Sequence, residues 1–80
     1  MDSELLKRIT IIPDLMGGKP TIRGMRFTVS DVLDYLSSGM TTEEILETFP
    51  YLEKQDITAA ILYAAKKINH PVIPVTLNAA

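Results

Sequence analysis

Lys19, Arg23 and Arg26 are the side chains in this sequence best suited to bind another molecule, because they lie close together among glycine-containing turns. Arginine pairs with carboxylates and phosphates through two parallel N–H groups, and lysine binds them as a point charge. The run Ile22-Arg23-Gly24-Met25-Arg26-Phe27 predicts a very short β-hairpin, since glycine at the first central position suits a type II′ turn. In that hairpin Arg23 and Arg26 face each other, which is unfavourable unless an acidic group lies nearby.

Three interpretations of these basic side chains are open. In the first, they bind an acidic partner, for which a carboxylate cluster of a protein is preferred to a DNA backbone. In the second, their side chains project into water. In the third, the arginines pair with Asp31 or Asp34 of the same chain. Residues 1–29 carry five basic and three acidic side chains, whereas residues 30–56 carry one basic and seven acidic side chains. This asymmetry indicates two surfaces with different partners, so we predict a partner-binding site at the basic side chains.

The start of the last predicted helix offers a second binding site. Two short helices over 42–49 and 53–68, joined by a short turn, are typical of a helix-turn-helix unit, whose second helix enters the major groove of DNA. The side chains on that helix that suit DNA are Lys54, Gln55, Thr58 and, further along, Lys66. Glutamine pairs with adenine, and lysine pairs with guanine or phosphate. The carboxylates of Glu53 and Asp56 lie beside them and repel phosphate, which makes DNA binding the weaker expectation.

The same helix carries more apolar surface than one small domain buries. Its predicted core stripe is Ile57, Ala60, Ile61, Ala64 and Ile68. Leu62 and Tyr63 lie on the flank of that stripe. Because a chain of 80 residues is marginally stable alone, we expect a homodimer with Leu62 and Tyr63 in its interface.

No residue pattern supports catalysis or a cofactor. The single histidine, His70, precedes a proline at a predicted helix end and has no second histidine to share a metal. The absence of cysteine excludes a thiol nucleophile and thiolate metal sites. Gly17-Gly18-Lys19 resembles part of a phosphate-binding loop, but Pro20 stands where such a loop continues into a helix. We expect a protein that is not an enzyme, with no catalytic residue, metal or cofactor.

The elements that position these residues follow from apolar periodicity. We expect a single domain over 1–80 of the mainly α class, with short strands or a hairpin over about 9–28. An extended C-terminal tail is expected over 70–80, where prolines interrupt the pattern. The three helices are expected at about 29–38, 42–49 and 53–68.

Capping residues mark the boundaries of these helices. Thr28 with Asp31, and Thr41 with Glu44, have the spacing of N-terminal capping boxes. Gly39 is suited to end the first helix, because glycine adopts the left-handed conformation found just beyond many helix ends.

The composition excludes a membrane protein. The first residues, Met-Asp-Ser-Glu, lack the basic and apolar regions of a signal peptide. No apolar run approaches the roughly 20 residues of a membrane span. We therefore expect a cytoplasmic protein with no membrane partner.

Several short segments occur together in one bacterial family. They are Ile12-Pro13, Met16 to Gly24, Arg26 to Val29, Gly39, Glu43 to Leu46, Phe49-Pro50, Leu52, Asp56-Ile57, Ala59-Ala60 and Tyr63 to Ala65. On these segments the chain resembles the domain-of-unknown-function family four-three-three, a family of small antitoxin-like proteins. The resemblance implies a three-helix, homeodomain-like helix-turn-helix fold preceded by short β-strands. It also implies an antitoxin of the VapB style, encoded beside a PIN-like ribonuclease that it neutralises.

We therefore expect an antitoxin-like protein that binds a PIN-like ribonuclease toxin and, second, an operator DNA. In the expected mechanism it covers the acidic, metal-dependent active site of the toxin, with Arg23 or Arg26 in place of the charge of the metal. The alternatives are a stand-alone helix-turn-helix DNA-binding regulator and a non-catalytic dimeric adaptor.

Overall fold

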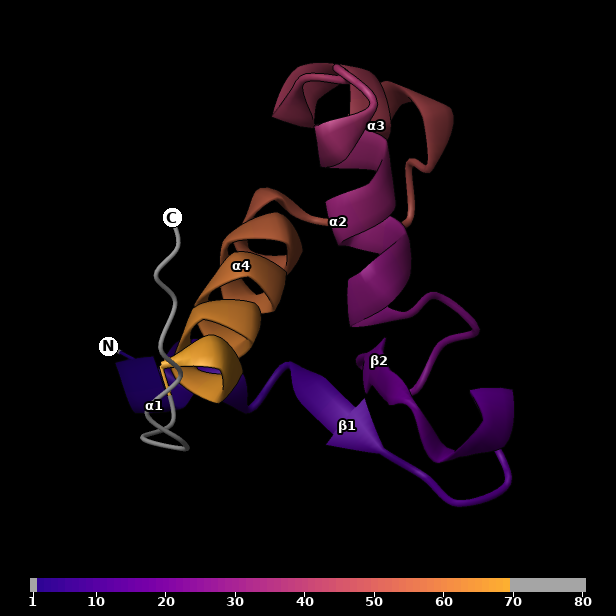
Figure 1. Ribbon diagram of the computed structural model, residues 1–80. Coiled ribbons are helices and arrows are strands. Elements are labelled where there is room, and N and C mark those ends of the chain that lie inside the picture. Colours follow the sequence, from indigo (N-terminus) through magenta and orange to yellow (C-terminus); the bar gives the residue numbers. More distant parts are fainter. Residues whose placement is uncertain (1, 70–80) are drawn as a thin grey trace.

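The computed structural model describes residues 2–69, in which four α-helices accompany a small two-stranded antiparallel sheet (Figure 1). In chain order the elements are α1 (Asp2–Leu6), β1 (Ile9–Ile11), the 3₁₀ turn η1 (Met16–Gly18), β2 (Pro20–Ile22), α2 (Val29–Ser37), α3 (Thr42–Thr48) and α4 (Lys54–Ile68). The mainly α class, with short strands ahead of a three-helix unit, is confirmed. The predicted tail over 70–80, including His70, lies outside the described residues.

The sheet pairs β1 with β2 across the loop that contains the two adjacent glycines. Its register places Ile9 opposite Ile22, Thr10 opposite Thr21 and Ile11 opposite Pro20. The predicted glycine turn in the connecting loop is confirmed, since Gly17 and Gly18 have φ angles of +68° and +81°.

The predicted hairpin turn at Gly24-Met25 is wrong by one residue. The amide of Met25 donates to the carbonyl of Ile22 at 2.8 Å, so Arg23 and Gly24 are the central residues of the turn. Both have positive φ, 47° and 72°, as a type I′ turn requires. A positive φ is unfavourable for arginine, which is why the sequence alone favours the glycine-first alternative.

Helix α2 begins and ends at the predicted capping residues. The Asp31 amide donates to the hydroxyl of Thr28 at 2.9 Å, and the Thr28 amide donates to the Asp31 carboxylate at 3.0 Å, which completes the capping box. Beyond the C-terminus, Gly39 has a φ of +103° and donates to the carbonyl of Leu36. The amide of Met40 donates to Tyr35, so the two bonds form the Schellman pattern of a helix end.

Helices α3 and α4 are joined by a short turn and form the predicted helix-turn-helix unit. The capping box of Thr41 and Glu44 at the start of α3 is present, with hydrogen bonds of 2.8 and 3.1 Å. One apolar cluster joins the unit to α2 and β2. Its buried members are Ile22, Phe27, Val29, Val32, Ile45, Leu52, Ile57 and Ala60.

Helix α4 is rotated relative to the predicted core stripe. Ile57 and Ala60 are buried as expected, but Ile61 is 46% exposed and Ile68 is 82% exposed. Ala59 is fully buried instead. Because α4 is apolar around most of its circumference, periodicity alone does not distinguish neighbouring stripes.

Helix α1 is an element that the sequence analysis did not predict. It is one and a half turns long, too short to form by intrinsic propensity. In the structure α1 packs against α4, with Leu5 and Leu6 half-buried (Figure 1). This contact covers part of the surface of α4.

Candidate DNA and partner interface

A buried carboxylate, Asp56, joins the start of α4 to the turn that follows β2. The side chain of Asp56 is fully buried, and its two oxygens accept hydrogen bonds from Arg23: Nε donates to Oδ1 at 3.0 Å and Nη2 to Oδ2 at 2.8 Å. Arg23 Nη2 also donates to the carbonyl of Tyr51 at 3.0 Å. The turn at Arg23-Gly24 is therefore held against the first turn of α4.

A second arginine completes this cluster. Arg8, between α1 and β1, donates through Nη1 to Asp56 Oδ1 at 2.9 Å and to Glu53 Oε1 at 2.7 Å. Burial raises the pKa of the Asp56 carboxyl, but hydrogen bonds from Arg23, the Glu53 amide and Arg8 outweigh it and leave the pKa below its usual value. The carboxylate thus stays charged and paired.

The expectation that Arg23 and Arg26 face each other is wrong. Arg23 pairs inside the molecule, as the third interpretation allowed, although its partner is Asp56 and not Asp31 or Asp34. Arg26 points the other way, with Nη1 3.9 Å from the sulfur of Met16. Arg23 has a positive φ, and its side chain reaches the first turn of α4.

Lys19 and Arg26 keep exposed side chains beside η1, and neither is in an ion pair within residues 2–69. These two are therefore the members of the predicted partner-binding set that face solvent. The proposed partner role of Arg23 now rests on the exposed third of its side chain, because the rest of its guanidinium is engaged.

The first turn of α4 presents the predicted DNA-binding side chains to solvent. Lys54, Gln55 and Thr58 are all exposed, whereas the neighbouring Asp56 points inward to its arginines. Glu53 is bound by Arg8 at 2.7 Å. The repulsion of phosphate expected from these two carboxylates is consequently weakened by the positive charges that pair with them.

Lys66 is not brought together with these residues. It lies in the last turn of α4, twelve positions beyond Lys54, which corresponds to about 18 Å along a helix axis. The structure therefore divides the predicted DNA-binding set into a group at the start of α4 and one lysine near its end.

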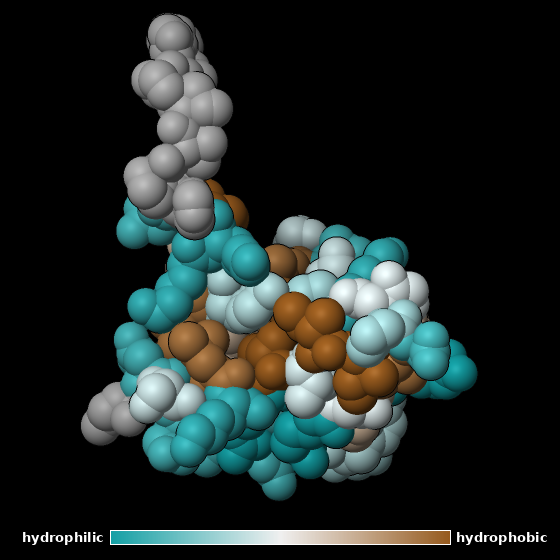
Figure 2. Space-filling model, turned by 90° about the horizontal axis from the view of Figure 1, so that it is seen from below, coloured by the Kyte–Doolittle hydropathy of each residue, from teal (hydrophilic) through white to brown (hydrophobic). Residues whose placement is uncertain are grey.

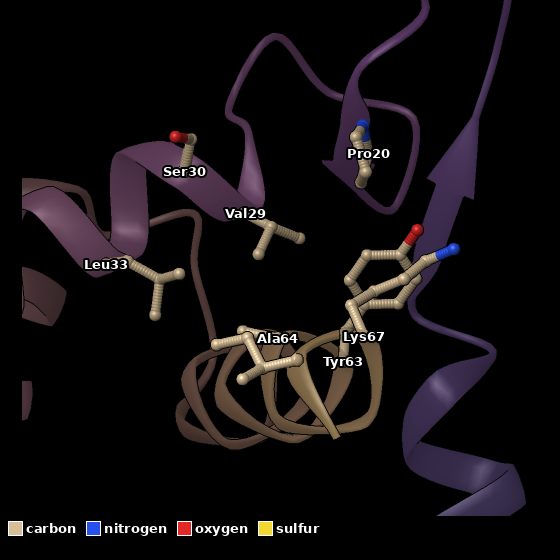
Figure 3. A pocket seen from close by; sticks show the side chains of 8 residues that line it. Pro20, Val29, Ser30, Leu33, Tyr63, Ala64 and Lys67 are labelled. Atoms are coloured by element: carbon tan, nitrogen blue, oxygen red, sulfur yellow. The ribbon is translucent and has the colours of Figure 1, made fainter. Parts of the chain in front are cut away.

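A groove lies between α2 and the second half of α4, with a volume of about 310 Å³ (Figure 3). Its lining residues are Pro20, Val29, Ser30, Leu33, Tyr63, Ala64, Lys67 and Ile68. Tyr63, predicted at a dimer interface, is half-buried in this groove, and Lys67 Nζ lies 5.7 Å above its ring. Leu62 is half-buried and does not line the groove.

Three residues near the site were missed by the sequence analysis. Asp56 was not recognised as the partner of Arg23 and Arg8, and no local signal links them because 33 and 48 positions separate Asp56 from the two arginines. Tyr51 was read only as part of a turn, yet it is 54% exposed beside the start of α4. Its ring packs edge-on against Phe27 and Phe49, with centroid distances of 6.4 and 6.2 Å.

Within 2–69, no three His, Asp or Glu side chains are close enough to hold a metal ion. In the same part of the chain, no helix has the length and apolar character needed to cross a membrane.

The fold and site define a small helix-turn-helix domain whose α4 has an exposed polar start and a partly exposed apolar end. The chain belongs to the family described as "Protein of unknown function (DUF433)", whose model matches residues 9–64. This membership and the fold implied by the resemblance are confirmed.

The chain is also similar to a curated protein and to a solved structure. The chain is 39% identical over 56 residues to uncharacterized protein y4eO of Sinorhizobium fredii (strain NBRC 101917 / NGR234). That match covers 70% of the chain but 25% of y4eO, so the chain spans a quarter of the length of this relative. The crystal structure of a DUF433 member from Anabaena variabilis ATCC 29413 at 2.00 Å has a TM-score of 0.74 and 30% identity, covering 82% of this chain and 65% of that chain.

Proposed function

We propose that this protein is the DNA-binding, antitoxin-like component of a toxin–antitoxin pair. One observation carries the DNA-binding half of the proposal. At the start of α4, the side chains suited to DNA face solvent while the two neighbouring carboxylates are bound by arginines. This arrangement leaves Lys54 and Gln55 free to contact a phosphate and a base edge.

The other half of the proposal concerns a protein partner. Lys19 and Arg26 are exposed, lie beside η1 and have no carboxylate partner within residues 2–69. A PIN-like ribonuclease carries an acidic, metal-binding active site, which is the kind of surface that arginine and lysine neutralise. The resemblance of the chain to small antitoxin-like proteins supports this choice of partner.

DNA binding is tested with duplexes from the upstream region of the gene itself, compared with random duplexes at equal salt. The proposal expects the upstream duplex to bind more tightly, with an affinity that falls steeply as salt rises. If the protein bound neither duplex at about 50 mM salt, the surface at the start of α4 would not be a DNA-binding site.

The toxin half is tested by co-expression with the product of the adjacent gene. The expected result is a complex that co-purifies and in which the ribonuclease activity of the partner is suppressed. DNA binding without any such partner would favour the stand-alone regulator, and a partner complex with no effect on activity would favour the adaptor.

A further inference from the structure

The second half of α4 exposes a stripe of apolar side chains. Ile61 is 46% exposed, Ala65 is exposed and Ile68 is 82% exposed, and the three follow one another at helical spacing. The same face of α4 begins with Lys54 and Thr58, so its polar half is followed by an apolar half. An isoleucine as exposed as Ile68 at the end of an apolar stripe indicates a surface that is covered by another chain.

The groove between α2 and α4 lies next to this stripe, since Ile68 also lines the groove. Its walls are formed mainly by apolar side chains, among which Val29 and Leu33 point toward α4 in Figure 3. The Ser30 hydroxyl points away from α4, and Lys67 lies over the ring of Tyr63 (Figure 3). The groove thus lacks the several convergent polar groups that hold a small ligand, and it suits an apolar side chain of a protein.

The two helices that border the groove carry opposite charges. Helix α2 contains Asp31 and Asp34 and no basic residue, and Asp34 lies one turn beyond Ser30 on the same side of the helix. The last turn of α4 contains Lys66 and Lys67. Neither Asp34 nor Lys67 is in an ion pair within residues 2–69. This surface is complementary to itself in charge as well as in apolar character.

We propose that a second copy of this chain occupies the groove, so that Ile68 of each copy packs against Val29 and Leu33 of the other. In a two-fold arrangement the same patch is used twice, and Lys67 of each copy then faces Asp34 of its partner. The interface is formed at the end of α4, where the groove lies, rather than by Leu62 on its flank. This proposal does not depend on DNA or toxin binding.

The face seen from below the view of Figure 1 carries an apolar area of its own. Figure 2 shows hydrophobic residues gathered across its centre, surrounded by hydrophilic ones. An apolar centre with a polar rim is the usual anatomy of a protein interface.

The first test is sedimentation equilibrium of the full chain over about 1–200 µM, a range that brackets a micromolar dissociation constant. The wild-type chain is expected to dimerise. Ile68→Glu is expected to weaken dimerisation roughly tenfold or more, because it places a charge at the apolar centre. Thr48→Glu, at an exposed position on α3, adds the same charge away from the groove and should leave dimerisation unchanged. Far-UV circular dichroism and a cooperative melting transition for each protein, recorded at about 1 µM where dissociation is favoured, establish that the variants fold.

Charge exchange provides a second and more specific test. Asp34→Lys and Lys67→Glu should each weaken the dimer, and the double variant should restore it, since the exchanged charges again face each other. Because the chain has no cysteine, a mixture of Asp34→Cys and Lys67→Cys proteins should also form a mixed disulfide under mild oxidation, in higher yield than a mixture of Thr48→Cys and Lys67→Cys.

Three outcomes would overturn the proposal. The first is that the wild-type chain stays monomeric throughout the concentration range, since the groove would then not be occupied by a second copy. The second is a dimer that Ile68→Glu does not weaken. The third is a charge exchange that fails to restore association. Failure of DNA or toxin binding would leave all three measurements unaffected.

Discussion

The guanidinium of Arg23 lies 2.8 Å from the buried carboxylate of Asp56, although 33 positions separate the two residues in the sequence. Arg23 also has a φ of +47°. A left-handed conformation costs about 1–2 kcal/mol for a residue with a side chain. The ion pair with Asp56 offsets this cost.

We expect Arg23→Ala to lower the free energy of unfolding by about 1–2 kcal/mol, a value reduced for the partial solvent exposure of the guanidinium. Arg26→Ala removes an exposed arginine three positions away and should leave stability unchanged. Urea denaturation of both variants measures the difference. Equal stability of the two would show that the pair with Asp56 contributes nothing.

Arg23→Gly separates the two effects at this position. It removes the same ion pair as Arg23→Ala but relieves the unfavourable φ, so it should be more stable than the alanine variant by about 1 kcal/mol. The same denaturation measurement applies. If the alanine variant had a free energy of unfolding equal to or above that of the glycine variant, the backbone at position 23 would have left the positive-φ conformation once the arginine was removed.

The pKa of Asp56 predicts how stability depends on pH. Its folded-state pKa is lowered from an ordinary value of 3.8, so the unfolded chain binds the proton more readily. The stabilisation is therefore fully present above about pH 5 and is lost as the pH falls below 4 and through the folded-state pKa. Asp56→Asn should show a shallower loss of stability in acid, measured by urea denaturation between pH 7 and pH 3. If the free energy of unfolding of the two proteins fell in parallel with pH, groups other than Asp56 would account for the acid sensitivity.

Gly39 supplies a prediction about backbone conformation alone. Its φ is +103°, and a Cβ added there would meet no atom within 4 Å. Gly39→Ala should therefore destabilise the protein by about 1 kcal/mol or more through strain and not through a clash. Thermal denaturation detects the change. Ser38→Ala, at the adjacent exposed position, serves as a control for loss of helix-end hydrogen bonds.

Lys54 and Lys66 are matched lysines at opposite ends of α4. If the start of α4 contacts DNA, Lys54→Ala should weaken binding to every sequence and reduce the slope of log affinity against log salt by about 1. Lys66→Ala should leave that slope unchanged. Fluorescence anisotropy at several salt concentrations measures both, and equal slopes for the two variants would argue against a DNA contact at Lys54.

The parts of the fold that the sequence predicted correctly are those determined by neighbouring residues. Thr28 with Asp31 and Gly39 satisfy backbone groups within a few positions of themselves, so their roles are visible in the sequence. The turn at Arg23 was misplaced because its conformation depends on a distant carboxylate. Helix α1 was missed for a similar reason, since a helix of five residues depends on packing against another element, here α4.

The candidate site was predictable in its residue types but not in its geometry. Lys54 and Gln55 were identified from their position at the start of a helix, and they are exposed as that position implies. The inward direction of Asp56 depends on two arginines from other elements, so no local pattern reveals it. Ile68 was placed in the core because isoleucine at helical spacing is usually buried.

Asp56 is bonded to Arg8 before β1, to Arg23 after β2 and to the amide of Glu53 at the start of α4. Detaching the first strand from the domain would therefore leave a carboxylate buried with one of its partners lost, which is strongly unfavourable. We therefore expect the strand pair and the first turn of α4 to open as a single cooperative unit. In hydrogen exchange, the amides of Ile22 and Arg23 should become exposed together with those of α4, and not in an earlier, separate step.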